Sequence, residues 1–508
     1  MTAAAAARGL PAILAAIRPR PRSRELMLLG VVAAALAVGS LSLGTTLAAR
    51  PVLDTGSVPG TLEPALADGG GLAIYLAGLL AVHLAFVVTG RRTDQVLLPV
   101  VGLLGGLGLL LMQRLPQGLV TQTFGGLELG LGHAQLLWLL LALGVVGTLG
   151  IVVRSDRWLR LYKYTWAAAG IALLLLTFVL GREVNGQRLT LEIGPLAGQP
   201  SELLKVILVV FLAGYLSENR SLLTEESTRL GPLRLPPLPY LAPMAAMWAI
   251  ALGIVVVQRD LGAALLFFTV FLFLLYVATG RPGYVVVGIV LFLAGSFVLY
   301  HLVGTVQTRV DIWLDPFKDP QGTGYQIIQA LYAFARGGLL GTGLGAGLPT
   351  INGALPIPEV HTDFPLAALG EELGLVGVMA ILGLFLVVVE RGLRIAASAA
   401  DEFRALLAAG LSLVIGTQAF IIAAGNLKLI PLTGITLPFI SYGGSSLLVN
   451  GVIVGLLLAL SDRGVEPPPP PKPRSRLARL TGRVTRLETP AAARAPLPPS
   501  AGPGGGER

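Results

Sequence analysis

The stretch Pro358–Phe364 gathers carboxylates, a histidine and a threonine ahead of an apolar segment, and Glu371 and Glu372 follow two helical turns later. Ionisable groups at a membrane boundary are costly and are usually functional. Asp363 and Glu371, at i and i+8, would share one face of a helix that starts near Asp363. The pattern therefore predicts a catalytic or ligand-binding carboxylate. The alternative is that Thr362 or Asp363 only caps this helix.

A second polar group lies at the predicted helix start Gln199–Lys205. Glu202 and Lys205, at i and i+3, share a face just inside the bilayer. Two interpretations stay open: a buried ion pair that locks helices together, or a polar wall for a charged ligand that enters from the outer leaflet. Upstream, Asn185-Gly186 is a turn signal and predicts a small hairpin.

A third polar group, Gln258-Arg259-Asp260, interrupts a long apolar run. It predicts a tight turn between two helices. Asp260 is suited to cap the second helix, and the Arg259 guanidinium is suited to attract a phosphate.

The predicted outer loop 306–363 is long for a compact membrane protein, and such loops are usually functional. It carries Arg336 and the glycine-rich run Gly337–Gly347, whose spacing fits neither the Walker motif nor G-x-G-x-x-G. We expect this run to be flexible backbone that closes on a substrate, with N–H groups free for phosphate.

The last outer loop, 426–445, contains prolines, glycines and a hydroxyl cluster that cannot form an ordinary transmembrane helix. Irregular backbone at membrane depth is tolerated only where it lines a cavity or is buried in protein. Lys428 with the hydroxyls of Ser441–Ser446 forms a second candidate anion-binding wall.

Composition defines the elements that must hold these groups. The 508 residues are 54% hydrophobic and 13% charged, with a mean hydropathy of +0.77. Because a bilayer core of ~30 Å needs ~20 apolar residues per helix, we predict an all-α polytopic transmembrane bundle of about twelve spans. The predicted spans are 26–49, 71–90, 96–113, 133–153, 165–181, 199–217, 239–257, 261–279, 284–305, 364–390, 405–425 and 446–461. The chain has no cysteine, which excludes disulfides and a cysteine nucleophile.

Arginine-rich segments precede the first span and recur in alternate loops. By the positive-inside rule they are cytoplasmic, and an even span count places both termini there. The net charge of +9 is thus explained by topology rather than by nucleic-acid binding. We expect four segments: a cytoplasmic N-terminal segment 1–25, N-terminal spans 26–180, a core 181–461, and a largely disordered, Pro/Arg-rich cytoplasmic tail 462–508.

Together these motifs resemble the SEDS family (shape, elongation, division and sporulation), the RodA/FtsW/SpoVE peptidoglycan glycosyltransferases. The matching motifs, in family order, are Asn185-Gly186, Gly194-Pro195, Gln199-Pro200-Ser201-Glu202 with Lys205, Gln258 with Asp260 and Gly262, Gly337–Gly347, Pro358–Phe364, Gly370-Glu371-Glu372 and Pro431 through Ser446. Two departures stand out. Leu189 follows Arg188 where many members have Trp, and two N-terminal spans are added to a family core of ten, as in some RodA-like proteins.

The resemblance implies a bacterial cytoplasmic-membrane enzyme whose outer face polymerises lipid II into β-1,4 glycan strands with inversion. Asp363 matches the catalytic aspartate and would act as the base. The substrate-binding candidates are Glu202, Lys205, Gln258, Asp260, Arg336, His361, Thr362, Glu371, Glu372, Lys428, Ser441 and Ser445. Among them, Lys205, Arg336 and Lys428, with Arg259, are candidates for the diphosphate. Glu202 would orient Lys205, and Glu371 or Glu372 would tune Asp363 by like-charge proximity.

The resemblance also implies a partner, a class B penicillin-binding protein that docks through its single transmembrane helix, and other elongation or division proteins. No dedicated metal cluster is visible, and a bridging divalent cation, Mg²⁺ or Mn²⁺, stays open. Two other functions compete with polymerisation: a lipid II flippase, and a non-catalytic scaffold of the cell-wall synthesis complex.

Overall fold

The computed structural model describes residues 19–49, 69–124, 127–184, 187–193, 196–225, 228–230, 233–235, 249, 253, 256, 260–347 and 355–462. They belong to one compact unit, Met1–Gly464. The predicted tail beyond residue 462 and the first 18 residues lie outside the described part of the chain.

Eleven helices among the described residues are long and apolar enough to cross a membrane. They are α2 (Ser23–Ala49), α4 (Gly70–Val88), α5 (Leu97–Arg114), α6 (Leu131–Val152), α8 (Lys163–Leu180), α9 (Pro200–Glu225), α11 (Leu261–Thr279), α12 (Pro282–Leu302), α15 (Pro365–Ala397), α16 (Glu402–Asn426) and α17 (Gly444–Ser461). Each overlaps a span predicted from hydropathy. Of the remaining predicted span, 239–257, the structure describes only residues 249, 253 and 256. The prediction of a polytopic helical membrane protein is confirmed.

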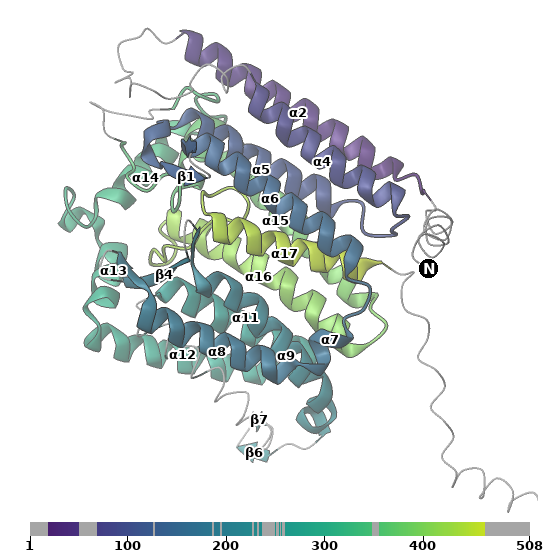
Figure 1. Ribbon diagram of the computed structural model, residues 1–508. Coiled ribbons are helices and arrows are strands. Elements are labelled where there is room, and N and C mark those ends of the chain that lie inside the picture. Colours follow the sequence, from purple (N-terminus) through teal and green to yellow (C-terminus); the bar gives the residue numbers. More distant parts are fainter. Residues whose placement is uncertain are drawn as a thin grey trace, which may run out of the picture. The chain divides into compact units, whose positions relative to one another are not determined.

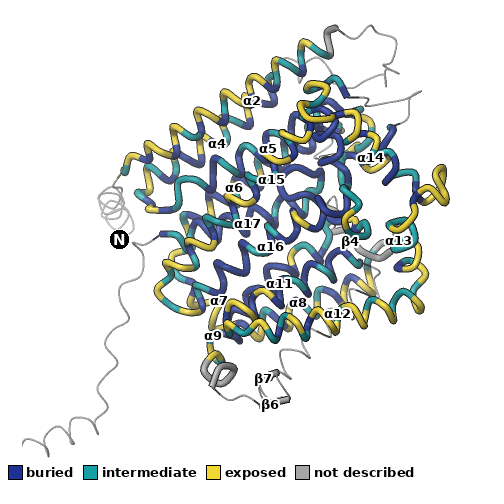
Figure 2. The backbone as a smooth tube through the Cα atoms, turned by 180° about the vertical axis from the view of Figure 1, so that it is seen from behind, coloured by how far each residue is buried: buried dark blue, intermediate teal, exposed yellow. Residues whose placement is uncertain are grey.

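Helix α16 packs against α9, α11, α15 and α17 (Figure 1). Its membrane-spanning window is 78% buried, whereas that of α12 is only 6% buried. The contrast is visible along the chain in Figure 2, where α12 is mostly exposed and α16 mostly buried. Because the exposed residues of α12 include Leu291, Leu293 and Phe297, this outer surface is suited to lipid rather than water.

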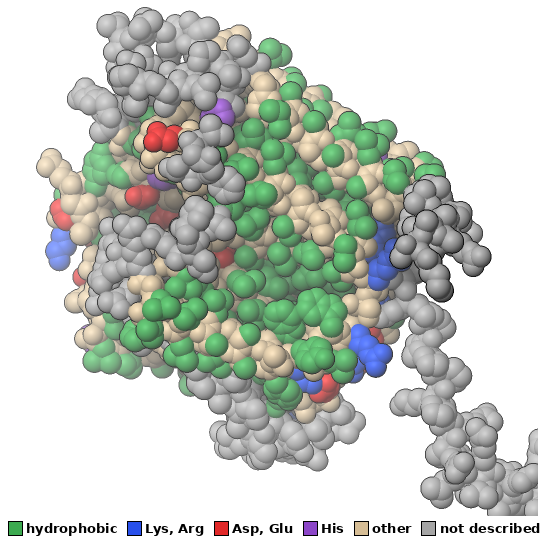
Figure 3. Space-filling model, in the orientation of Figure 1, with side chains coloured by type: hydrophobic (Ala, Val, Ile, Leu, Met, Phe, Trp, Pro, Cys, Tyr) green, Lys and Arg blue, Asp and Glu red, His purple; other side chains and the backbone are tan. Residues whose placement is uncertain are grey.

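Basic side chains cluster at the end of the bundle where α2 begins and α17 ends, on the right of Figure 3. Arg91 Nη1 lies 2.8 Å from Asp462 Oδ2, and Arg404 Nε lies 2.9 Å from Asp156 Oδ1. Further ion pairs at this end join Lys163 to Glu218, Arg220 to Glu402 and Arg391 to Asp94. The structure therefore places at one end of the bundle the basic loops that the positive-inside rule assigns to one side of the membrane.

The opposite end carries short elements between the spans. They are η2 (Gln117–Leu119), the hairpin β1 (Gln122–Phe124) and β2 (Leu127–Leu129), the antiparallel sheet β3 (Arg182–Val184), β4 (Gln187–Ile193) and β5 (Leu196–Gly198), α13 (Gly304–Leu314), η3 (Pro316–Lys318) and α14 (Tyr325–Gly337). Val184 pairs with Gln187, so the strands predicted on either side of Asn185-Gly186 form the expected hairpin. The basic end adds α7 (Arg157–Leu161), β6 (Thr228–Leu230) and β7 (Leu233–Leu235).

Helix α15 is broken at Gly374, where φ is 67° and ψ is −170°. The glycine-rich run pairs with this break. Thr342 N donates to Glu371 O at 3.0 Å, and Leu375 N donates to Gly338 O at 2.9 Å. Pairing with α15 occupies backbone groups on both sides of the break. The expectation of flexible glycine backbone with N–H groups free for phosphate is therefore wrong at these positions.

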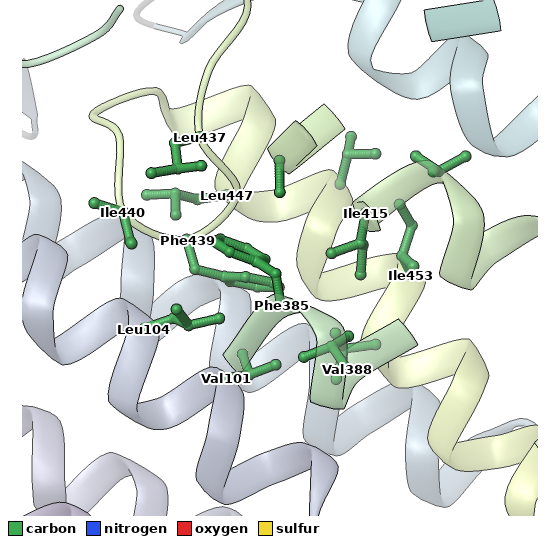
Figure 4. Close-up of a cluster of buried hydrophobic side chains, with 14 of the residues drawn as sticks. Val101, Leu104, Phe385, Val388, Ile415, Leu437, Phe439, Ile440, Leu447 and Ile453 are labelled. Atoms are coloured by element: carbon green, nitrogen blue, oxygen red, sulfur yellow. The ribbon is translucent and has the colours of Figure 1, made fainter. Parts of the chain in front are cut away.

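The loop between α16 and α17, residues 427–443, has no regular secondary structure but is anchored by apolar side chains. Leu437, Phe439 and Ile440 are buried in a cluster with Phe385 of α15 (Figure 4). Phe439 adopts a φ of 66°, an unusual value for a bulky side chain. The irregular backbone is therefore held in protein, as the sequence predicts for such a segment at membrane depth.

Replacing Gly374 by alanine should destabilise the protein. A Cβ there would lie 2.5 Å from Leu339 O, and the left-handed φ adds strain of about 1–3 kcal/mol. Gly383→Ala in the same helix is the matched control, because no atom lies within 4 Å of its Cβ position. We expect a lower melting temperature of the detergent-solubilised protein for Gly374→Ala alone. Equal melting temperatures for the two variants would contradict the role assigned to the break.

Candidate active site

The Asp363 segment forms a tight turn immediately before α15. Asp363 N donates to Glu359 O at 2.9 Å. The residue that precedes α15 is Phe364, and no side chain caps the helix there. The alternative in which Thr362 or Asp363 serves as the cap is therefore wrong, whereas the helix begins at Pro365, close to its expected start near Asp363. The Asp363 side chain is available for another role.

Three consecutive carbonyls of this segment are fixed by neighbouring elements. Tyr442 N donates to His361 O at 2.8 Å, and Ser441 Oγ donates to Thr362 O at 2.6 Å. Asn426 Nδ2, at the end of α16, donates to the carbonyl oxygen of Asp363 at 2.9 Å. The backbone that carries Asp363 is thus held by α16 and by the α16–α17 loop. Such fixation limits the movement of the carboxyl group.

Burial dominates the electrostatics of this carboxyl. It raises the pKa of Asp363 to about 6, with a further rise from the neighbouring Glu359 carboxylate. The Thr362 hydroxyl and the Arg309 guanidinium act in the opposite direction. Glu359, rather than Glu371 or Glu372 as predicted, is therefore the like charge that tunes Asp363.

Arg309 of α13 is a charged neighbour that the sequence reasoning did not single out. Its Nη1 donates to Thr433 O at 3.1 Å. A Cβ placed on Gly434 would lie 3.6 Å from Asp363 Oδ2 and 3.9 Å from Arg309 Nη2. The glycine thus lies beside both an acid and a cation. Arg309 lies in the predicted outer loop, outside the motifs recognised in the sequence. Only the tertiary structure shows that it lies at the site.

Asp260 caps α11, as the sequence predicts, by accepting from Ala263 N at 3.0 Å. Its other oxygen lies 3.4 Å from Gln199 Nε2. Burial raises the pKa of Asp260, and the Arg309 guanidinium lowers it. Asp260 and Asp363 therefore share Arg309 as a counter-charge. Gln258 lies outside the described residues.

Lys205 lies inside the bundle, with 2% of its surface exposed. Its Nζ donates to Glu202 Oε2 at 2.6 Å, to Gln418 Oε1 at 2.8 Å and to Asn450 Oδ1 at 3.3 Å. An ammonium has three donors, and all three are used here. These contacts join α9 to α16 and α17. They favour the locking ion pair over the polar wall.

Glu371 and Glu372 lie on the first part of α15 and bind arginines from other elements. Arg336 Nη2 of α14 lies 3.5 Å from Glu371 Oε1. Arg114 Nη1 of α5 lies 2.5 Å from Glu372 Oε1, which also accepts from Gly345 N at 2.8 Å. These carboxylates connect the broken helix to α5 and α14. A small cavity here is lined by Arg114, Leu115, Arg336, Leu355, Pro356, Ile357, Val360, Ala368 and Glu371.

The predicted wall of Lys428 and hydroxyl groups does not form as one surface in the described contacts. Lys428 Nζ donates to Leu314 O at 3.5 Å, and the Lys428 carbonyl accepts from Trp313 Nε1. Ser441 Oγ donates its hydrogen bond to the Thr362 carbonyl of the Asp363 segment, as described above. Ser445 is half-buried at the start of α17.

Within the described ranges, no three His, Asp or Glu side chains are grouped so that they could hold a metal ion.

The fold and this site define a class of protein: a multi-pass membrane protein with a buried acid between its bundle and its loops. The chain belongs to the FtsW/RodA/SpoVE family, whose model, described as cell cycle protein, matches residues 94–464. Helices α2 and α4 precede the matched region.

Similar proteins are curated as peptidoglycan glycosyltransferases. RodA of Mycobacterium tuberculosis is 42% identical over 409 residues, which cover 80% of this chain and 85% of that protein. RodA of Mycobacterium leprae is 40% identical over 401 residues, 77% of this chain and 84% of that protein. A probable FtsW of Geobacter metallireducens is 38% identical over 316 residues, 62% of this chain and 80% of that protein.

Two solved structures share the fold. A chain from work on structural coordination of polymerization and crosslinking by a peptidoglycan synthase complex is 28% identical, with a TM-score of 0.57. The match covers 73% of this chain and 98% of that chain. A mutant of RodA from Thermus thermophilus is 26% identical, with a TM-score of 0.50, over 74% of this chain and 99% of that one.

Removing the Lys205 charge should destabilise the bundle. Lys205→Met leaves the buried Glu202 carboxylate without its cation, and breaking a buried pair in this way typically costs about 3–5 kcal/mol. We expect a lower melting temperature in detergent. Glu202→Gln combined with Lys205→Met should recover part of the loss, because no buried charge is then left unpaired. A single variant as stable as the wild type would contradict the locking role.

Proposed function

We propose that this chain is a peptidoglycan glycosyltransferase that polymerises lipid II, with Asp363 as the general base. The observation that carries the proposal is the position of Asp363, a half-buried carboxyl on fixed backbone whose pKa is raised to about 6. A base with a pKa slightly below the working pH is ionised and still accepts a proton well. The curated names of its relatives support the choice of reaction.

The proposed reaction joins two lipid-linked sugars. The 4-hydroxyl oxygen of the acceptor forms a bond to C1 of the donor, and the bond from C1 to the diphosphate oxygen breaks. The hydroxyl proton passes to Asp363, and the bonding electrons leave with the diphosphate. Attack opposite to the leaving group converts the α-linked donor into a β-1,4 linkage.

Two buried oxygens close to Asp363 are suited to sugar hydroxyls. Asn426 Oδ1 and Thr433 Oγ1 have no hydrogen-bond partner among the described residues, and their residues are 0% and 8% exposed. A buried acceptor without a donor is costly, and a bound hydroxyl would relieve that cost. Both residues flank the Asp363–Arg309 gap through the contacts described above.

Charge stabilisation of the departing diphosphate requires a cation. Arg336 fits this task better than Lys205. The Arg336 side chain is 35% exposed and lies 3.5 Å from Glu371, whereas Lys205 has all three donors engaged inside the bundle. We propose Arg336 as a diphosphate-binding residue and Lys205 as a structural one.

We further propose that both termini are cytoplasmic and that the site faces the outside of the bacterial cytoplasmic membrane. The basic end of the bundle supports this orientation. The solved synthase complex supports a transpeptidase partner, a class B penicillin-binding protein whose membrane helix would contact the lipid-facing surface.

Asp363→Asn should abolish polymerisation. The purified variant would be incubated with lipid II, with and without the transpeptidase, and the glycan products separated by gel electrophoresis. The amide keeps the size of the carboxyl but cannot take the proton, so we expect a loss of at least about 10²-fold. Asp319→Asn, an exposed aspartate in the same outer region, is the matched control and should keep wild-type activity.

Equal polymer from wild type and Asp363→Asn would remove Asp363 as the base. Lipid II transfer across vesicles without polymer would favour a flippase, and an inactive wild type that only binds the transpeptidase would favour a scaffold.

The polymerisation rate of the wild type should fall on the acid side, with a midpoint near pH 6. Asp363 must be deprotonated to act, and its pKa is raised to about 6, so the active fraction decreases as the pH falls through that value. Above pH 7 the rate should be nearly constant until other groups titrate. A midpoint near pH 4, the value of an ordinary aspartate, would show that burial does not tune this group.

A further inference from the structure

Arg309 is anchored by one hydrogen bond and lies in the field of two acids. Its Nη1 donates to the Thr433 carbonyl at 3.1 Å, and the Asp260 and Asp363 carboxylates both raise its pKa against the lowering effect of burial. A guanidinium presents five donors in a planar fork. The Thr433 contact therefore holds one edge of the fork. Asp260 is in turn fixed as the cap of α11.

Gly434 lies beside both Arg309 and Asp363. Its φ is +70°, in the left-handed region that favours glycine. The point where its side chain would begin lies within 4 Å of both Arg309 Nη2 and Asp363 Oδ2. The guanidinium and the carboxylate are therefore close enough for their charges to interact in a partly buried site, although no direct ion pair joins them.

The charged groups around Asp363 come from several elements. Glu359 acts on Asp363 from its own segment, and Arg309 acts from α13. Asp260, at the start of α11, acts on Arg309, and Glu202 of α9 acts on Asp260. Glu359 and Arg309 thus oppose each other at Asp363. The Glu359 side chain is exposed, so solvent screens its charge. The burial that lowers the pKa of Arg309 also reduces the screening of the Arg309 charge.

We propose that Arg309 is a positioning residue for the catalytic base: anchored on Thr433, it keeps Asp363 ionised and oriented for proton transfer. The inference rests on the proposed function of Asp363. It assigns to α13, an element without recognisable motif spacing, a direct role in the chemistry. Asp260 extends this role, because its charge also acts on Arg309.

The test compares three variants by the pH dependence of lipid II polymerisation. Arg309→Gln keeps a donor for the Thr433 carbonyl but removes the charge. We expect the acid-side midpoint to rise, so that the loss of activity is largest at acidic pH and shrinks as the pH is raised. Arg309→Lys restores the charge and should bring the midpoint back towards the wild-type value. Glu359→Gln removes the opposing charge and should lower the midpoint.

A merely structural Arg309 would give another pattern. Arg309→Gln would then reduce the rate by the same factor at every pH, and Arg309→Lys would not rescue it. Either result overturns the inference while leaving Asp363 as the base. If Asp363 is not the base, the Asp363→Asn variant still forms polymer. Failure of the proposed function is thereby distinguished from failure of the inference on Arg309. The infrared band of the Asp363 carboxyl, identified by its loss in Asp363→Asn, gives the pKa of Asp363 without substrate. An unchanged pKa of this band in Arg309→Gln would also overturn the inference.

Discussion

The site depends on one half-buried carboxyl, Asp363, which is carried on backbone fixed by neighbouring elements. Three successive carbonyls, from His361 to Asp363, accept hydrogen bonds from α16 and the α16–α17 loop. That loop is in turn anchored by buried apolar side chains such as Phe439. Burial shifts the Asp363 pKa to about 6 because the carboxyl cannot relax towards solvent. Packing of an irregular loop therefore determines the acid–base chemistry.

The broken helix α15 supplies the second constraint. Its interruption at Gly374 exposes backbone groups that would otherwise bond within the helix, and the glycine-rich run satisfies them. The preceding turn places Glu371 and Glu372 against Arg336 and Arg114. The residues of this conspicuous motif thus join α5, α14 and α15 into one support for the Asp363 segment. In this respect the motif is mainly architectural.

Hydropathy was sufficient to predict the eleven spans found among the described residues, because ~20 apolar residues per crossing is a strong physical requirement. The Asn185-Gly186 hairpin and the Asp260 cap also followed from local chemistry. Local rules failed where long-range contacts decide. They could not place Arg309 beside Asp363, exclude Glu371 as its neighbour, or show that the glycine backbone is paired. Each of these outcomes depends on contacts between residues far apart in the sequence. No spacing pattern in a single sequence shows that such residues lie together.

The most direct test of the central claim compares two titrations on one preparation of the wild-type protein. The pKa of Asp363 is obtained from the infrared carboxyl band that Asp363→Asn removes, and the kinetic pKa from the acid side of lipid II polymerisation. We predict that both lie near 6 and coincide. An infrared pKa near 4, or a kinetic midpoint that does not follow it, would contradict the account of Asp363 as a buried catalytic base.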